Sequence, residues 1–314
     1  MARILAADIG GTNSRFAAFT LAGGELSLDA ATWLRTREVD GFADLLDRLW
    51  TTDIGLGPDD VDLAVIAVAG AVERGRTYCR LSNADWDVAL EEDGSGHGLH
   101  RALLLNDFEA QAYATRTPIV DTARVVQEGR AAEHGAVAAI GAGTGLGHCA
   151  MVRCKEGWAT VPSEAGHVSF PFQSKAECRY GEFLCKATKA PYCYGDLVVS
   201  GLGLSLLHLY LTGRERSPDQ VAAEMDPNGD TARYFARYYA RACRNYALAV
   251  VATGGLFISG GVAARNPGLV TSQAFLDEFT LSPRYSELLA AIPIRLNTEQ
   301  DSGLWGAAYF AGQV

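Results

Sequence analysis

Residues 4–20, ILAADIGGTNSRFAAFT, contain two apolar runs around a segment rich in glycine. The runs predict two strands, and the segment between them predicts the tight turn of a β-hairpin. Glycine allows backbone N–H groups to crowd around phosphate oxygens and tolerates the positive φ angles of such turns. Taken alone, the segment is more often an ordinary hairpin turn, because Gly-Gly turns are common.

The same pattern returns near the middle of the chain, at AAIGAGTGLGHCAMV, residues 138–152. A strand, a turn with glycine and threonine, and a returning strand again predict a hairpin. Two such turns can hold one triphosphate from both sides, which favours phosphate binding over two unrelated turns. The candidate nucleotide-binding residues in the two segments are Asp8, Gly10, Gly11, Thr12, Asn13, Gly141, Gly143, Thr144 and Gly145.

Asp8 adds a carboxylate to the first turn, and we expect it to bind Mg²⁺ through water, since magnesium gives up its hydration reluctantly. Other phosphate motifs fit poorly. No G-x-x-x-x-G-K-[ST] sequence occurs, which excludes a P-loop. Gly145-x-Gly147-x-x-Ala150 leads into a strand pattern rather than opening a helix, which argues against a dinucleotide fingerprint.

Strands and helices alternate along the first third of the chain, with an amphipathic helix expected at residues 41–50 between buried strands. Two α/β lobes that each open with a glycine-rich hairpin, and that flank a cleft, are the arrangement of the ribonuclease-H-like, or actin-like ATPase, fold. We expect the small lobe at residues 1–107, the large lobe at residues 108–301, and a C-terminal helix at residues 302–314 that packs on the small lobe.

The composition is that of a globular protein, because 48% of the 314 residues are hydrophobic and 20% are charged. A net charge of -10 provides no basic field for nucleic acid or for an acidic membrane surface. Seven cysteines, an odd number, do not form a disulfide framework in a chain of this length. The chain starts on a strand pattern without a signal-peptide layout, so we expect a cytoplasmic protein with reduced thiols.

Asp107 is the candidate general base. Phosphoryl transfer requires positioning, charge neutralisation and one carboxylate to accept the hydroxyl proton. Asp107 follows an apolar run at residues 103–105, where a strand would end at a ligand crevice, and Asn106 offers a donor and an acceptor to a sugar. A helix-capping Asn-Asp pair is the alternative interpretation.

A second polar segment, SEAGH at residues 163–167, places Glu164 and His167 three residues apart around small residues. This spacing suits two neighbouring hydroxyls of a sugar, although either residue alone is more often a solvated loop residue.

At these motifs the chain closely resembles the bacterial glucokinases, within the hexokinases, actin-like ATPases and repressor–kinase sugar kinases. The resemblance covers nearly the whole length, and its motifs occur in the family's order. They are DIGGTN (8–13), LLLNDFEAQA (103–112), AAIGAGTGLG (138–147), PSEAGHVSF (162–170), GGLFISGGVAARNP (254–267) and SGLWGAA (302–308).

The resemblance implies that glucose is bound by Asn106, Asp107, Glu164 and His167, with Asn83 in a further sugar-side segment. It also implies that ATP is held by residues 141–145 together with Gly260 and Gly261.

The chain departs from the family at Asp196, which stands where the family usually has a glutamate that touches glucose. Asp196 is therefore a candidate sugar ligand with a shorter reach. The cysteines at 178, 185 and 193 are spaced seven and eight apart, unlike the close pairs of structural zinc sites.

The predicted function is transfer of a phosphoryl group from ATP to the 6-hydroxyl of glucose, with Asp107 as the base and Mg²⁺ as cofactor. One alternative is a kinase for another hexose or for an N-acetylated amino sugar, and another is a non-catalytic sugar sensor of the same fold. ADP or polyphosphate as donor is also compatible with such turns. The family resemblance implies a homodimer.

Overall fold

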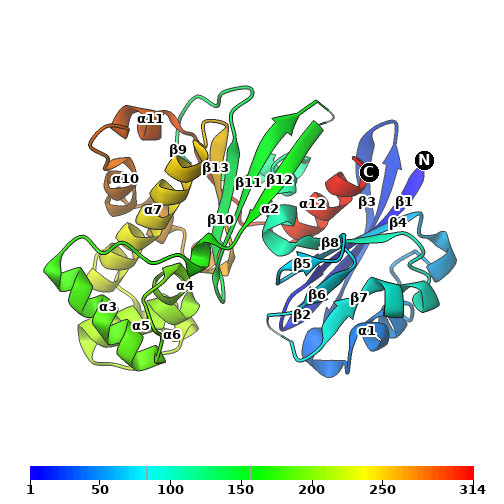
Figure 1. The fold of residues 1–314 in the computed structure, drawn as a ribbon, viewed down its shortest axis with the longest axis horizontal. Helices are drawn as coiled ribbons and strands as arrows, with labels where there is room; N and C mark the ends of the chain where they lie inside the picture. Colours follow the sequence, from blue (N-terminus) through cyan, green and yellow to red (C-terminus); the bar gives the residue numbers. More distant parts are fainter. Residues whose placement is uncertain (83, 156) are drawn as a thin grey trace. The chain divides into compact units, whose positions relative to one another are not determined.

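The computed structural model describes residues 1–82, 84–155 and 157–314. The chain divides into two compact units (Figure 1). Unit 1 consists of Met1–Asp121 and Glu299–Val314, and unit 2 consists of Thr122–Thr298. Each unit is built around its own sheet and its own apolar core.

The main sheet of unit 1 has five strands in the order β3-β2-β1-β4-β8. The glycine-rich hairpin supplies β1 and β2, which pair antiparallel, whereas β4 and β8 continue the sheet parallel to β1. β4, with the sequence LAVIAV, is buried along its whole length, as expected for a parallel strand covered on both faces. The strands are β1 (Ala2–Ile9), β2 (Asn13–Ala22), β3 (Glu25–Arg35), β4 (Leu63–Val68) and β8 (Ala102–Asn106).

A second, antiparallel sheet of three short strands lies between β4 and β8 in the sequence. Three α-helices occur among the described residues of unit 1. The short strands are β5 (Val72–Glu73), β6 (Tyr78–Arg80) and β7 (Asp87–Ala89), and the helices are α1 (Phe42–Leu49), α2 (Asp107–Ala114) and α12 (Ser302–Ala311).

Unit 2 repeats the plan of unit 1. Its six-stranded sheet has the order β12-β11-β10-β13-β14-β9, with an antiparallel β10–β11–β12 meander and with β13 and β14 parallel to β10. β9 pairs antiparallel to β14 at the edge. The strands are β9 (Arg124–Gln127), β10 (Val137–Ala142), β11 (Leu146–Cys154), β12 (Gly157–Ser163), β13 (Gly255–Ser259) and β14 (Ile294–Leu296).

Nine α-helices occur among the described residues of unit 2. The longest, α7, carries the fully buried Arg241, whose guanidinium donates to Glu177 Oε2 at 2.7 Å and to Glu278 Oε1 at 2.9 Å. This buried network ties α7 to α3 and α10. The helices are α3 (Lys175–Thr188), α4 (Gly195–Val198), α5 (Gly201–Thr212), α6 (Pro218–Glu224), α7 (Asp230–Val250), α8 (Gly261–Arg265), α9 (Gly268–Thr271), α10 (Gln273–Thr280) and α11 (Ser286–Ala291). None of the helices in the described residues is both long enough and apolar enough to cross a membrane.

Helix α2 explains why the units divide later than residue 107, the boundary expected from the sequence. α2 packs along α12, which lies beside it in unit 1 (Figure 1). Gly306 of α12 lies directly against the carbonyl oxygen of Ala110, where a Cβ has no room. Tyr113 of α2 adds a ring contact of 5.3 Å to Phe310. The boundary therefore follows α2, at Asp121.

The contact between α12 and α2 yields a prediction about stability. Gly306→Ala should destabilise the protein by about 1–3 kcal/mol, because the added methyl group overlaps the Ala110 backbone and forces the helices apart. Thermal unfolding followed by circular dichroism measures the effect. Gly268→Ala, at a helical position where a Cβ meets nothing within 4 Å, is the matched control and should leave the midpoint unchanged or slightly higher. Equal midpoints for the two variants would contradict the prediction.

Candidate active site

The first glycine-rich turn is closed by a hydrogen bond from the Gly10 N–H to the Asn13 carbonyl at 3.1 Å. A Cβ on Gly10 would lie 3.1 Å from that carbonyl, so glycine suits this position. The chain after β3 supports the turn from outside, since the Thr36 N–H donates to the Thr12 carbonyl at 3.0 Å. Arg35 donates to the Asn13 side chain at 3.2 Å. The Thr12 side chain is exposed.

Asp8 lies near the end of β1, opposite Arg15 on β2, with 3.3 Å between the carboxylate and the guanidinium. Burial raises the pKa of the Asp8 carboxyl group, Arg15 opposes this change, and the nearby charge of Asp301 adds to it. A nearby cation would stabilise the ionised form of a carboxyl group whose pKa is raised in this way. No cluster of three or more metal-binding side chains occurs among the described residues, but Mg²⁺ on a nucleotide needs only one or two carboxylates. The Asp8 site therefore fits a hydrated Mg²⁺.

Asn106 and Asp107 form the corner between β8 and α2. The Asn106 side chain caps the helix by accepting the Phe108 N–H at 2.9 Å, and its amide donates to the Gly70 carbonyl at 3.1 Å. An Asp107 carboxylate oxygen also accepts the Phe108 N–H at 2.9 Å. The capping interpretation and the catalytic one are compatible, because an amide and a carboxylate each have further hydrogen-bonding capacity.

In unit 2, Asp196 of α4 lies against the second glycine-rich turn. Its Oδ1 accepts the Leu146 N–H at 2.9 Å, and its Oδ2 is 3.9 Å from His167 Nε2. The carboxylate fills the space beside Gly145 and Gly166, where Cβ atoms would overlap it. Burial raises the pKa of the Asp196 carboxyl group, while the Leu146 N–H and His167 oppose the change. Asp196 thus joins the turn to the segment that carries Glu164 and His167.

His167 and Glu164 lie in an exposed turn after β12 in which the His167 N–H donates to the Glu164 carbonyl at 3.0 Å. The His167 ring stacks on Tyr194 with 5.2 Å between centroids, and the Tyr192 hydroxyl donates to the His167 carbonyl at 2.9 Å. Sequence reasoning missed both tyrosines, because nothing in YCYG at residues 192–195 indicates a contact with a residue 25 positions earlier.

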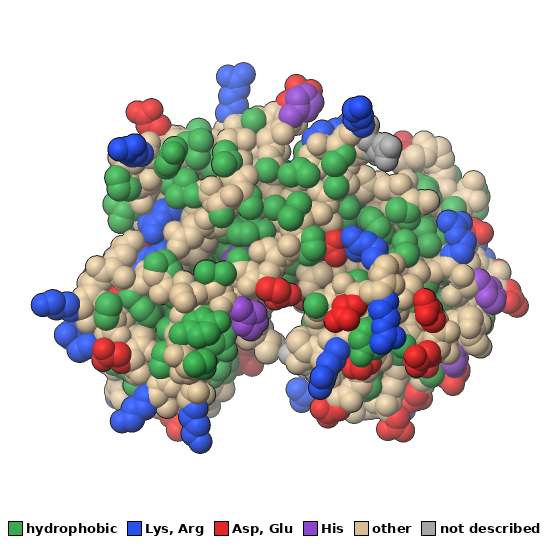
Figure 2. Space-filling model, in the orientation of Figure 1, with side chains coloured by type: hydrophobic (Ala, Val, Ile, Leu, Met, Phe, Trp, Pro, Cys, Tyr) green, Lys and Arg blue, Asp and Glu red, His purple; other side chains and the backbone are tan. Residues whose placement is uncertain are grey.

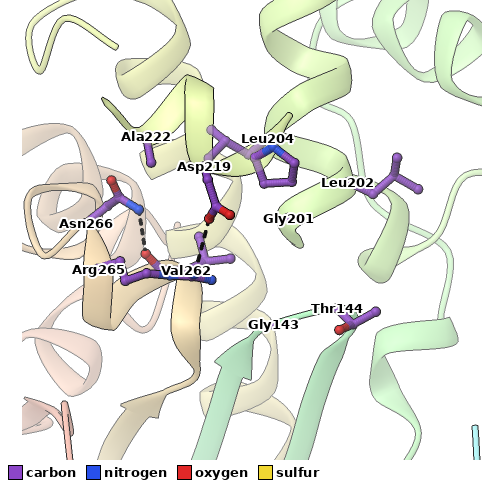
Figure 3. Close-up of a pocket in the computed structure, with 11 residues that line it drawn as sticks. Gly143, Thr144, Gly201, Leu202, Leu204, Asp219, Ala222, Val262, Arg265 and Asn266 are labelled. Carbon is purple, nitrogen blue, oxygen red and sulfur yellow. Dashed lines mark hydrogen bonds and ion pairs between the residues drawn. The ribbon is translucent and has the colours of Figure 1, made fainter. Parts of the chain in front are cut away.

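A cavity of about 290 Å³ lies beside the second turn in unit 2 (Figure 3). Gly143 lies at its edge, and a Cβ added to Gly143 would meet no atom within 4 Å. The Gly201 N–H donates to the Gly143 carbonyl at 2.9 Å and so supports the turn. The cavity is lined by Gly143, Thr144, Gly201, Leu202, Leu204, Pro218, Asp219, Ala222, Val262, Arg265 and Asn266.

Among the residues predicted to hold ATP, Gly143 and Thr144 line this cavity, and Gly260 and Gly261 lie just before the lining residues of α8. Gly260 has a φ of 89° and leaves no room for a Cβ beside the Ala142 carbonyl. Gly141 is the last but one residue of β10, and Gly145 lies against Asp196. Of these five glycines, Gly143 lines the cavity, and the other four lie within two residues of a residue that lines it.

The far side of the cavity is formed by α8, which lies within the family motif at residues 254–267, and by α6, which sequence reasoning missed. Arg265 donates to Asp219 across it at 3.1 Å and to the Gly261 carbonyl at 3.1 Å (Figure 3). Both side chains of the Arg265–Asp219 pair are largely exposed, so the pair adds little stability and can rearrange around a ligand. Asn83, the remaining predicted sugar ligand, lies outside the described residues.

The fold and these groups define a class. Two α/β units of the same plan, each with a glycine-rich turn between two antiparallel strands and with acidic residues at the strand ends, are typical of sugar kinases with the actin-like ATPase fold. Solved structures support the class: the glucokinase from an Antarctic psychrotroph is 27% identical, with a TM-score of 0.83 and coverage of 99% of this chain and 98% of its own. The Balamuthia mandrillaris glucokinase in complex with glucose has a TM-score of 0.82 at 18% identity, covering 99% and 93%.

The family model described as Glucokinase matches residues 5–314, so the chain belongs to the glucokinase family. The glucokinase of Caulobacter sp. (strain K31) is 30% identical and covers 97% of this chain and 93% of its own length. A ROK family glucokinase from Streptomyces griseus, in complex with glucose and AMPPNP, shares the fold with a TM-score of 0.60 at 18% identity, covering 98% of each chain. The predicted family and fold are confirmed.

Gly143 provides the test of the cavity. Gly143→Val should raise the KM for ATP about tenfold or more while the KM for sugar changes little, because the new side chain meets no protein atom but enters the cavity assigned to the nucleotide. Gly41→Val, at an extended position in unit 1 with nothing within 4 Å of its Cβ, is the control. An unchanged ATP dependence in folded Gly143→Val would remove this turn from the nucleotide site.

Proposed function

We propose that the protein phosphorylates glucose at its 6-hydroxyl with ATP as donor. In this reaction Asp107 accepts the hydroxyl proton, the sugar oxygen bonds to the γ-phosphorus, and the bond to the β–γ bridging oxygen breaks to release ADP. The observation that carries the proposal is the family membership together with a half-buried carboxylate at the β8–α2 corner, in the unit that also holds the first glycine-rich turn and Asp8.

For the sugar, we assign binding to Asn106 and Asp107 of unit 1 and to Glu164 and His167 of unit 2. Amide, carboxylate and imidazole groups bind sugar hydroxyls through directional hydrogen bonds. The stacking of His167 on Tyr194 and the hydrogen bond from Tyr192 support a fixed orientation of that imidazole. The Balamuthia mandrillaris and Streptomyces griseus neighbours, both solved with glucose, support glucose as the sugar.

For the nucleotide, we assign the cavity beside Gly143 and Thr144 in unit 2, and the residues from Asp8 to Asn13 in unit 1. The AMPPNP in the Streptomyces griseus neighbour supports ATP over ADP or polyphosphate. Asp8 would hold Mg²⁺ through its waters. When bound, Mg²⁺ neutralises charge on the phosphates as the γ-phosphoryl group leaves.

The cellular setting is also part of the proposal. Free thiols at all seven cysteines are in keeping with a cytoplasmic enzyme. The family resemblance supports a homodimer and a place at the entry of glucose into glycolysis. Gel filtration with light scattering tests the oligomeric state.

The substrates are tested by coupled ADP release from the purified protein with a panel of sugars and donors. Glucose with Mg·ATP should give the highest kcat/KM. A preference for another hexose or for an N-acetylated amino sugar would replace the substrate, and binding of glucose without turnover would indicate a sensor.

Asp107 is tested by Asp107→Asn, which keeps the shape and the bond from the Phe108 N–H but removes the base. We expect kcat to fall about a hundredfold or more while sugar binding, measured by calorimetry, is largely kept. Asp121→Asn, a change of the same kind at the end of unit 1, is the control. If Asp107→Asn retains more than a tenth of the wild-type kcat, another group is the base.

Asp196 is tested through selectivity, because its carboxylate is shared between the Leu146 N–H and the neighbourhood of His167. Asp196→Glu should lower the KM for glucose and raise the ratio of kcat/KM for glucose over mannose, since the longer side chain reaches a hydroxyl that aspartate meets only through water. The two proteins are compared at the same ATP concentration. Unchanged glucose kinetics in Asp196→Ala would show that Asp196 has no part in sugar binding.

A further inference from the structure

The Arg76 side chain donates three hydrogen bonds at the corner that carries Asn106 and Asp107. Its Nη1 donates to the Leu104 carbonyl of β8 at 3.2 Å, two residues before the corner. The same guanidinium donates to Glu109 of α2 through Nη1 at 3.2 Å and through Nη2 at 3.0 Å, two residues after Asp107. One rigid, planar group therefore bonds to the strand on one side of the corner and to the helix on the other.

Glu109 transmits this contact to Asn106. Its Oε2 accepts the backbone N–H of Asn106 at 3.1 Å, while the carboxylate is also bound by Arg76. The Glu109 side chain is only 2% exposed, whereas the Arg76 side chain is 33% exposed. A carboxylate this deeply buried depends on its charged partner, because removal of the partner would leave an uncompensated charge.

The backbone at Arg76 is held in a conformation that a non-glycine residue rarely adopts. Its φ is 74°, and the preceding Arg74 and Gly75 have φ values of 50° and 65°. The Arg76 carbonyl accepts the Leu104 N–H at 2.8 Å, and the guanidinium lies 5.2 Å from the Phe310 ring centroid. Strained backbone of this kind persists where surrounding contacts determine it, and it concentrates near functional sites.

We propose that Arg76 is a positioning residue for the transfer reaction: through Glu109 and Leu104 it sets the direction in which the Asn106–Asp107 corner presents the base and the sugar-binding amide. The proposal rests on the proposed function of Asp107. Arg76 itself touches neither sugar nor phosphate in this scheme. Its effect reaches the reaction through the geometry of the corner, where a displacement of about 1 Å costs on the order of a hundredfold in rate.

The test compares Arg76→Met, Arg76→Lys, Glu109→Ala and the double variant Arg76→Met/Glu109→Ala with wild type. Arg48→Met is the matched control, because Arg48 also binds a carboxylate with two nitrogens, Asp44 at 3.1 and 3.2 Å, but on α1. Each protein is measured for kcat, for the KM values of glucose and Mg·ATP, and for its thermal midpoint.

Arg76→Met and Glu109→Ala should each lower kcat about tenfold to a hundredfold and raise the KM for glucose, with the KM for ATP within about twofold of wild type. The double variant should be no slower than the worse single variant, because the two residues act as one unit. Arg76→Lys should restore part of kcat, since it keeps the charge but not the two-nitrogen geometry. Arg48→Met should keep wild-type kinetics.

A purely structural role would lower the thermal midpoint and leave kcat of the folded enzyme unchanged, and this result would overturn the proposal. Losses that multiply in the double variant would overturn it as well. If Arg76→Met does not fold, the same kinetics are measured for Glu109→Gln, which keeps the size of the side chain and loses one acceptor for Arg76. A wild-type kcat in Glu109→Gln would overturn the proposal. An inactive wild-type protein would refute the proposed function, whereas active wild type with equally active Arg76→Met refutes only the role of Arg76.

Discussion

The parallel pairing of β1, β4 and β8 is the constraint on which the site in unit 1 depends. Asp8 is paired with Ala67, and Ala67 is paired with Leu105, so β1 and β8 end at the same edge of the sheet. The first turn and the Asn106–Asp107 corner both leave the sheet there, as ligand sites do in parallel α/β sheets. A shift of one residue of β1 against β4 would turn the side chain of Asp8 to the opposite face of the sheet, and the same shift of β8 against β4 would turn that of Asn106. Unit 2 repeats the arrangement, with Gly141 of β10 paired with Ser259 of β13.

Several glycines in the recognisable motifs leave room for carboxylates. Gly145 and Gly166 leave the space that the Asp196 carboxylate fills, and a Cβ on Gly303 would lie 3.1 Å from Asp8 Oδ2. Burial raises the pKa of both of these carboxyl groups, which places them among the groups whose charge depends on a nearby cation or donor. The motif glycines thus allow the acidic groups of the site to be packed closely into each unit.

The sequence predicts what is local. The two hairpins, the end of β8 and the corner at Asn106 follow from strand periodicity and turn residues within about ten positions. It does not predict contacts between residues far apart, such as Arg76 with Glu109, Tyr192 with His167, or Asp219 with Arg265. No periodic pattern records such pairs, because they arise when separate elements pack together. For the same reason the attachment of α2 to unit 1 needed the structure, since it depends on Gly306 in α12.

An acidic protein must hold an acidic nucleotide by local means. The chain carries a net charge of -10, and on the face shown in Figure 2 acidic and basic side chains are interspersed on each unit. Near the site, Arg15, Arg76 and Arg265 are each bound to a carboxylate. Their positive charge is therefore partly neutralised by carboxylates of the protein itself. In the proposed reaction the phosphates depend mainly on backbone N–H groups of the two turns and on Mg²⁺, which explains why glycine, rather than lysine or arginine, dominates both turns.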